Sequence, residues 1–164
     1  MSGPARVAVV GAGLAGCEAA LLLADAGIAV TLYEQKPAHF SPAHKKAGFA
    51  ELVCSNSLKA DRLDSASGLL KAEMRLLGSH LLDAAETARV AAGGALAVDR
   101  DVFSDTVTAM VEAHPGITIC REEVTGLTAS GEEIVLIATG PLTEGALAEA
   151  IREATGQDSL SFFD

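Results

Sequence analysis

The stretch that decides the fold is VAVVGAGLAG, residues 7–16 of the 164-residue chain. Its apolar first half predicts a buried strand, which ends where the glycine-rich turn begins. Residues 14–26 are rich in Ala and Leu and predict a helix, with Gly27 as its stop signal. Residues 28–33 predict a second strand. These parts form a β-α-β unit, whose crossover is expected to be right-handed.

The three glycines of this stretch have separate roles in a dinucleotide-binding turn. Gly11 permits the tight turn, Gly13 lets the backbone approach a pyrophosphate, and Gly16 allows the helix to pack closely on the strand. The N-terminus of the helix offers free N–H groups and the positive end of its dipole to the phosphates. We therefore predict that the whole turn binds a cofactor, through Gly11, Ala12, Gly13, Leu14, Ala15 and Gly16.

Glu34 is the predicted ribose ligand. It ends the second strand, 18 residues after Gly16, close to the roughly 20-residue spacing expected for an acid that binds the ribose hydroxyls. An acid at this position disfavours the 2′-phosphate of NADP. The alternative interpretation is a tight β-α turn without a ligand, and an ordinary charge at the end of a strand.

A second glycine turn near the end of the chain favours FAD over NAD. The apolar run 134–138 predicts a strand, and it leads into Thr139-Gly140. This segment resembles the A-T-G turn of flavoproteins with two dinucleotide-binding domains, where the turn passes close to the FAD. We therefore expect an α/β, Rossmann-like FAD/NAD(P)-binding fold with a mainly parallel sheet, and Thr139 and Gly140 as further cofactor ligands.

The rest of the chain is expected to complete one FAD-binding domain, residues 1–164. A stretch without periodicity, from about 35 to 60, predicts a long loop that faces cofactor or substrate, because such loops tend to be functional. The other predicted elements are helices 67–77, 79–88, 101–114 and 143–155, the last capped by Thr143, and strands 96–98, 117–120, 124–127 and a strand beginning at 160–163. With nothing after that strand, we expect the fold to be truncated.

The composition limits the classes of protein to which the chain can belong. Hydrophobic residues make up 49% of the chain but aromatic residues only 4%, which suits helices packed on a parallel sheet. No apolar run approaches the roughly 20 residues of a membrane helix, so we expect a soluble protein. Three cysteines without a C-x-x-C pair argue against a disulfide framework or a zinc site and favour the reducing cytoplasm, with no metal.

The formal net charge of −10 is unevenly distributed. Residues 1–82 hold eight Lys/Arg against seven Asp/Glu, whereas residues 83–164 hold four against fifteen. The acidic half would repel a polyanion. One locally basic region lies in or beside the long loop, and it would either meet RNA phosphates or form a solvated loop; it consists of Lys36, Lys45, Lys46, Lys59 and Arg62.

Four further segments, in this order, resemble the folate/FAD-dependent tRNA (uracil-5-)-methyltransferase family. They are PAH at 42–44 with FAELVCSNSLK at 49–59, GLLKAEMR at 68–75, AGGALAVDR at 92–100 and ATGPLT at 138–143. The resemblance runs from about residue 7 to 164, whereas members of that family are more than twice this length. It therefore implies the N-terminal portion of a longer enzyme.

The resemblance implies a reaction and its cofactors. Methylenetetrahydrofolate would supply a one-carbon unit to carbon five of a T-loop uridine in tRNA, giving 5-methyluridine. Reduced FAD would supply the electrons, and NAD(P)H would recharge the flavin. Most tRNA contacts would come from the absent C-terminal part, and this chain alone is expected to be inactive.

Three other interpretations stay open. The first is a related tRNA-modifying flavoprotein of the carboxymethylaminomethyl-uridine type, which shares the glycine turn and the Cys-Glu-Ala-Ala that follows at 17–20 but not the Cys-Ser-Asn-Ser block at 54–57. The second is a non-catalytic FAD-binding fragment. The third is a fragment of an NAD-binding dehydrogenase, which would bind nicotinamide nucleotide without flavin.

Cys54 is the candidate catalytic residue. Carbon five of uracil becomes nucleophilic when a thiolate adds to carbon six, so the chemistry needs a cysteine near the flavin. Cys54 is the cysteine in the long loop, but the family is also described with a further catalytic cysteine in the absent portion. Cys54 is therefore the nucleophile, a helper or a buried filler.

Four other polar residues complete the set of candidates. Asn56, together with His44 and Lys59, would contact flavin, folate or phosphate, or form ordinary hydrogen bonds within the loop. Arg100 lies at a predicted strand-to-helix turn, where it would face the cofactor or form a surface salt bridge.

Overall fold

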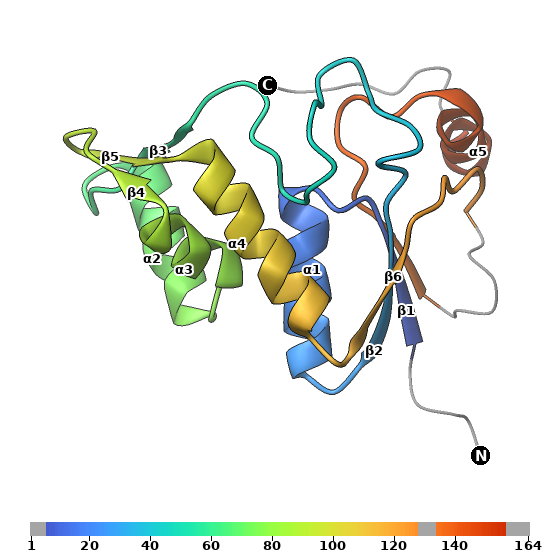
Figure 1. Cartoon of the computed structure of the whole chain (residues 1–164), viewed down its shortest axis with the longest axis horizontal. Helices are drawn as coiled ribbons and strands as arrows, with labels where there is room; N and C mark the ends of the chain where they lie inside the picture. Colours follow the sequence, from blue (N-terminus) through green and yellow to red (C-terminus); the bar gives the residue numbers. More distant parts are fainter. Residues whose placement is uncertain (1–5, 128–133, 157–164) are drawn as a thin grey trace.

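The computed structural model describes residues 6–127 and 134–156 (Figure 1). The strands are β1 (Arg6–Val10), β2 (Ala29–Tyr33), β3 (Ser57–Ala60), β4 (Arg89–Val90), β5 (Ala95–Val98), β6 (Ile117–Cys120) and β7 (Ile134–Ile137). The helices are α1 (Leu14–Asp25), α2 (Ala66–Leu76), α3 (His80–Thr87), α4 (Arg100–Ala113) and α5 (Gly145–Thr155).

A parallel sheet of four strands, in the order β6-β2-β1-β7, forms the centre of the molecule. β1 pairs with β2, where Val7 lies opposite Val30, and with β7, where Val9 lies opposite Leu136. The order reverses beside β1, because β2 and β6 extend the sheet to one side and β7 to the other. The predicted Rossmann-like arrangement is confirmed, and its ligand crevice is expected where the order reverses.

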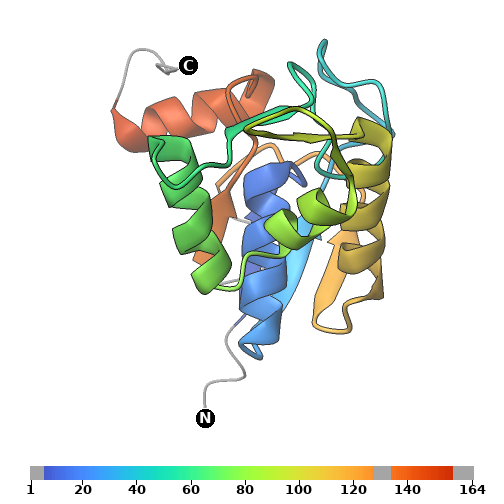
Figure 2. The same ribbon diagram turned by 90° about the vertical axis from the view of Figure 1, so that its left-hand side faces the viewer.

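Helices cover both faces of this sheet (Figures 1 and 2). Val7 and Val9 of β1 point to one face and join a large core with residues of α1, α3 and α4, among them Leu21. The alternate residues Ala8 and Val10 point to the other face and pack with Leu147 of α5. This alternation along one strand explains why β1 contains an unbroken run of apolar residues.

A second, antiparallel sheet in the order β3-β5-β4 was not predicted. It lies beside α2 and α3, at the opposite end of the molecule from α5 (Figure 1). The prediction placed β3 in the long loop because its pattern is irregular. Lys59 has a φ of 67°, and the pairing of β3 with β5 shifts between Ser57 and Ala60. A strand interrupted in this way leaves little trace in the sequence pattern.

Other boundaries also differ from the prediction. Residues 124–127 are not a strand, because Val124 and Leu127 instead pack against the core on the α5 face. Thr143 does not cap α5, which begins after Glu144. The strand predicted at 160–163 lies outside the described residues. Within the residues that the structure describes, no helix is long and apolar enough to cross a membrane.

A network of two arginines and two carboxylates ties the second sheet to its helices. Arg75 of α2 contacts Asp61 at 3.0 Å and Glu86 of α3 at 2.7 Å. Arg89 of β4 contacts the same two carboxylates, at 2.5 and 2.7 Å. Each carboxylate therefore pairs with two arginines. Such a salt-bridge network stabilises a fold more than isolated surface ion pairs do.

The network predicts an acid-sensitive contribution to stability. Burial alone would raise the pKa of Asp61, but hydrogen bonds from Arg89 and Arg75 lower it overall. The same two arginines donate hydrogen bonds to Glu86 and lower the pKa of that carboxyl. A carboxyl group whose pKa is lower in the folded state than in the unfolded state stabilises the fold at pH values above its unfolded pKa. This stabilisation is lost as the pH falls through the pKa of the folded state. Asp61→Asn is expected to cost about 1 kcal/mol near neutral pH, because the groups are partly exposed.

Urea unfolding of the wild type and Asp61→Asn, at neutral pH and at about pH 3, measures this effect. The difference in unfolding free energy between the two proteins should shrink in acid. A difference that stays constant between the two pH values would contradict the assignment.

Candidate functional site

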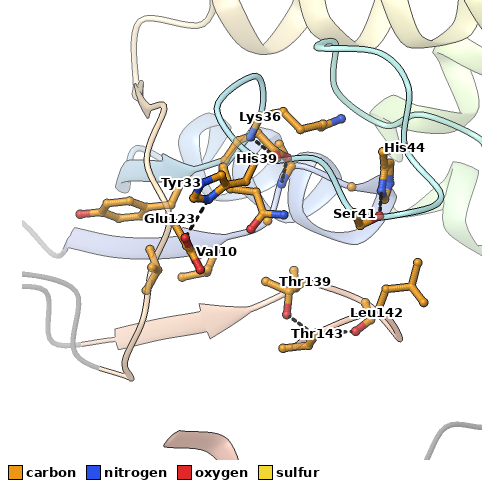
Figure 3. A pocket seen from close by; sticks show the side chains of 18 of the residues that line it. Val10, Tyr33, Lys36, His39, Ser41, His44, Glu123, Thr139, Leu142 and Thr143 are labelled. Carbon is orange, nitrogen blue, oxygen red and sulfur yellow. Dashed lines mark hydrogen bonds and ion pairs between the residues drawn. The ribbon is translucent and has the colours of Figure 1, made fainter. Parts of the chain in front are cut away.

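A cleft of about 830 Å³ opens at the carboxyl ends of β1, β2 and β7 (Figure 3). One wall is the glycine turn between β1 and α1, and another is the segment that follows β7. The long loop after β2 and the segment after β6 complete it. The cleft therefore lies where the order of the sheet reverses, as expected for a ligand site in a parallel sheet.

The glycines of the turn have different steric surroundings. Gly11 has a φ of +98°, and a Cβ there would lie 2.7 Å from the carbonyl oxygen of Ala138. A Cβ on Gly16 would lie 1.8 Å from the carbonyl oxygen of Gly11, so α1 packs directly on the turn. In the described part of the chain, a Cβ on Gly13 would meet nothing within 4 Å. Gly13 thus leaves an open approach from the cleft to the backbone.

The N-terminus of α1 has the features of an anion-binding site. Serine or aspartate side chains accept hydrogen bonds at the starts of α2, α3 and α4, from Ser65, Ser79 and Asp99. Among the described residues, no side chain caps α1, its N-cap is Gly13, and its first turn contains no acid. The free N–H groups at this end line the cleft, where they can donate to phosphate oxygens.

Glu34 is buried, with 7% of its surface exposed, and its carboxylate connects β2 to the glycine turn. Oε2 accepts a hydrogen bond from the backbone N of Ala12 at 3.1 Å, and Oε1 accepts one from the backbone N of Lys36 at 3.0 Å. A carboxylate has about four acceptor positions, so two remain for hydroxyl groups in the cleft. The predicted ribose ligand is thus held rigidly beside the predicted phosphate site.

Thr139 and Gly140 line the cleft opposite the long loop (Figure 3). The Oγ1 of Thr143 donates to the carbonyl oxygen of Gly140 at 2.8 Å and lies 2.6 Å from the Oγ1 of Thr139. Since the proton of Thr143 is used in the first bond, Thr139 donates in the second. These hydroxyls therefore present acceptors to the cleft and suit a ligand that donates hydrogen bonds.

The long loop is held to the core at its centre. The side chain of Ser104 on α4 donates to the carbonyl oxygen of Phe49 at 2.6 Å, and the hydroxyl of Thr108 accepts from the N of Phe49 at 2.8 Å. The backbone N of Ala50, which has a φ of 48°, donates to the carbonyl oxygen of Ala12 at 2.9 Å. The loop is thus fastened both to α4 and to the glycine turn.

Arg121 is a structural residue of the loop that the sequence analysis missed. It follows β6, and its Nη1 donates to the carbonyl oxygens of Lys36 at 3.1 Å and Ala47 at 3.0 Å. Its guanidinium lies 4.2 Å from the centre of the Phe49 ring. A signal in the sequence was present, because a basic residue directly after a parallel strand lies at the ligand edge of the sheet. Its partners, however, are 70 or more residues away in the chain.

Arg121→Ala is expected to lower the free energy of unfolding by about 1–2 kcal/mol, because the carbonyl oxygens of Lys36 and Ala47 and the ring of Phe49 lose their partner. Arg152→Ala is the matched control, since this arginine is similarly exposed but pairs with Glu149 on the surface of α5. The control should change stability by less than about 0.5 kcal/mol in urea unfolding. Equal effects of both substitutions would refute the role of Arg121.

Several predicted site residues do not line the cleft. Gly16 lies behind the turn and acts in packing, whereas Gly11 to Ala15, Glu34, Thr139 and Gly140 are all among the lining residues. Cys54 and Asn56 are exposed and are not among the described residues that line the cleft, although Val53 is. The carbonyl oxygen of Asn56 accepts from the N of Val98, so this residue continues into the second sheet.

Arg100 lines a separate pocket of about 200 Å³ with Lys45 and Lys46. Its Nη1 donates to the carbonyl oxygen of Leu52 at 3.3 Å.

Three of the five residues in the predicted basic region have polar partners for their charged groups. Lys36 is buried and its Nζ donates to the carbonyl oxygen of Gly48 at 2.6 Å. Lys46 pairs with Asp101, and Arg62 pairs with Asp64. Two of the five positive charges are thus paired with acids, which reduces the charge that this region offers to a polyanion.

Cys54 is expected to be the thiol that reacts first. Thiolates are the reactive form of cysteine. Cys17 is fully buried, and burial, with a smaller effect of Glu34, raises the pKa of its thiol to about 12. Cys54 is exposed and should react with an aromatic disulfide reagent in a fast phase of one thiol per chain. Cys54→Ser should remove this phase, and a fast phase that survives the substitution would contradict the assignment.

Comparisons with known proteins agree with this geometry. A family model described as Glucose inhibited division protein A matches residues 6–164. A Geobacter sulfurreducens protein named methylenetetrahydrofolate–tRNA-(uracil-5-)-methyltransferase TrmFO is 55% identical over 158 residues, which cover 96% of this chain and 36% of the relative. A Paramagnetospirillum magneticum protein of the same name is 58% identical over 159 residues, with the same coverage. The chain thus spans about a third of the length of these relatives.

A solved structure supports the fold independently. The crystal structure of Aquifex aeolicus GidA (form II) has a TM-score of 0.62 and 17% identity, over 82% of this chain and 24% of that one. The parallel sheet, the glycine turn and the cleft define a Rossmann-like α/β protein. The chain belongs to the glucose inhibited division protein A family, as the match over residues 6–164 shows.

Proposed function

We propose that this chain forms the FAD-binding part of an enzyme that makes 5-methyluridine in tRNA. The reaction would transfer a one-carbon unit from methylenetetrahydrofolate to carbon five of a T-loop uridine, with electrons from FAD that NAD(P)H has reduced. The identity of 53–58% with relatives named for this reaction supports the proposal. Among tRNA-modifying flavoproteins, this favours the methyltransferase over the carboxymethylaminomethyl type.

The observation that carries the cofactor assignment is the pairing of an uncapped helix with a buried carboxylate. The free N–H groups of α1, reached past Gly13, suit a pyrophosphate, which is anionic. Glu34, connected to the same turn through Ala12, suits the ribose hydroxyls. The acceptor hydroxyl of Thr139 suits a donor on the ligand, such as a ribityl hydroxyl. The described residues thus fit the adenosine diphosphate end of FAD and the chain that follows it.

The bound flavin would supply the two electrons that turn a methylene group into a methyl group. The chain's own residues would bind and orient it, and Cys54 would add to carbon six of the uracil so that carbon five becomes nucleophilic. Cys54 directly follows Val53, which lines the cleft, so a small movement of this exposed segment would bring the thiol to the cleft. Asn56 and Arg100 stay proposed ligands at this side of the loop.

We assign most tRNA contacts to the two thirds of the relatives that this chain does not span. The pairing of Lys46 and Arg62 with acids, and the acidic second half of the chain, support this division. The reducing cytoplasm is the proposed location, because the reaction needs Cys54 as a free thiol.

Two experiments test the proposal. Titration of the purified chain with FAD, followed by flavin fluorescence, tests the cofactor assignment, with NAD as the competing ligand. Preferential binding of NAD would instead favour a dehydrogenase fragment. For the reaction, the chain replaces the region that it matches in the Geobacter relative, and formation of 5-methyluridine in a tRNA transcript is measured. A chimera that binds FAD without forming 5-methyluridine would favour the non-catalytic fragment.

A further inference from the structure

The lining of the cleft differs between its two ends (Figure 3). Tyr33, His39 and Glu123 lie toward one end, and the Nδ1 of His39 is 2.8 Å from the Oε2 of Glu123. Ser41 and His44 lie toward the other end, on the opposite side of the cleft from Leu142. Glu34 follows Tyr33 directly, so the proposed adenosine site is at the first end. The ring system of a flavin dinucleotide would then extend toward the second.

The cleft combines exposed apolar surface with an imidazole at its second end. Leu14, Phe40, Val53 and Leu142 are all between 36% and 47% exposed and all line the cleft, so its mouth offers apolar surface to a flat ring. His44 also lines the cleft and is only partly exposed. Imidazoles are the side chains that most often transfer protons in enzymes. A ring that accepts electrons needs such a partner, because reduction also requires a proton.

His44 is fixed in place by its neighbour. The Oγ of Ser41 lies 2.6 Å from the Nδ1 of His44, and the backbone N of His44 donates to the carbonyl oxygen of Ser41 at 3.2 Å. The turn therefore sets the orientation of the imidazole, because Nδ1 is engaged and Nε2 remains for another partner. The charged groups that share the cleft are Glu34, Lys36, Glu51, Glu122, Glu123 and Glu144.

The long loop also contributes Glu51 and Lys36 to the lining of the cleft, and both are already engaged. Glu51 accepts hydrogen bonds from the backbone N atoms of Lys45 and Lys46, at 3.1 and 3.2 Å, and Lys36 donates to Gly48. His44 therefore offers a proton-transfer atom, Nε2, at this end of the cleft.

We propose that His44, positioned by Ser41, exchanges a proton with the flavin ring bound at this end of the cleft. The inference rests on the proposed function. If the bound ring received a hydride from a nicotinamide, one proton would have to follow to keep the charge of the ring unchanged, and His44 would donate it. When the hydride leaves to reduce the methylene group, the proton returns to His44.

The four histidines of the chain make this testable by NMR of their imidazoles, each assigned by substitution with Asn. ADP is expected to shift the signals of His39 alone, whereas FAD should shift those of His39 and His44. His80 and His114, which contact Asp25 away from the cleft, serve as internal controls and should not respond. On reduction of bound FAD with dithionite, the signals of His44 should shift again, whereas those of His80 and His114 should stay unchanged.

The outcomes separate the two proposals. If FAD shifts His39 but leaves His44 unchanged, the role of His44 is refuted while the nucleotide site stands. If neither ligand shifts His39 or His44, the cofactor assignment fails and the role of His44 with it. A second measurement is the pH dependence of the midpoint potential of bound FAD. In the wild type and in His39→Asn, the plot of this potential against pH should change slope. His44→Asn should remove this change, and a His44→Asn protein that still shows it would also refute the role of His44.

Discussion

Gly16→Ala is expected to abolish FAD binding and to destabilise the fold by about 3 kcal/mol or more. The new Cβ would lie 1.8 Å from the carbonyl oxygen of Gly11, which is a backbone atom and cannot rotate away. Either α1 moves off the sheet or the phosphate-binding turn changes shape. Since a domain of this size is stable by only about 5–15 kcal/mol, the loss is a large share of the total. Urea unfolding and FAD titration measure the two effects.

Gly13→Ala is the matched control for this prediction. The same methyl group, three residues earlier in the chain, meets nothing within 4 Å among the described residues, and its backbone is extended rather than left-handed. Stability should therefore fall by no more than about 1 kcal/mol, the loss of a glycine N-cap. FAD affinity should nevertheless fall, because the methyl group stands where the pyrophosphate would approach. If Gly13→Ala left FAD affinity unchanged, the phosphate site would have to lie elsewhere.

Glu34→Gln is expected to weaken FAD binding about 100-fold, equivalent to about 2.7 kcal/mol. The carboxylate accepts from the backbone N atoms of Ala12 and Lys36, and a glutamine amide can satisfy one of these but presents its own N–H to the other. The change therefore removes both the negative charge proposed to bind the ribose and one support of the turn. Binding of ADP should weaken by a similar factor, because the contact is with the adenosine part.

Glu122→Gln provides the comparison for Glu34. Glu122 lines the same cleft and carries the same charge, but it is exposed on the segment after β6. Its substitution should change FAD affinity less than about threefold, below 1 kcal/mol. A similar loss in both variants would mean that the overall charge of the cleft, and not a contact with Glu34, determines affinity.

The parallel sheet and the glycine turn were predictable because their signals are local. Val7 to Val10, the three glycines and the acid at Glu34 all lie within one β-α-β unit, whose geometry fixes where the strand ends meet. In the structure, the Oε2 of Glu34 lies 3.1 Å from the backbone N of Ala12, as the geometry of this unit requires. The strand before Thr139 was also predictable, because an apolar run followed by a glycine has few other interpretations.

The second sheet and the support of the loop were not predictable in this way. β3 is broken at Lys59, where φ is 67°, so it lacks the alternation of a strand. Ser104 and Thr108 appear as ordinary helix residues, and their bonds to Phe49 span 55 and 59 residues. Contacts between residues so far apart in the chain leave no periodic pattern in a single sequence.

The hydrogen bond from the N of Ala50 to the carbonyl oxygen of Ala12 would have a consequence for the proposed reaction. The peptide group of Ala12 belongs to the turn that would hold the pyrophosphate, and Ala50 precedes Cys54 by only four residues. A ligand that tightens the turn must also restrain the segment carrying the thiol. Occupancy by nucleotide and the reactivity of this cysteine would then change together, so that the thiol becomes available in its working position when the flavin has arrived.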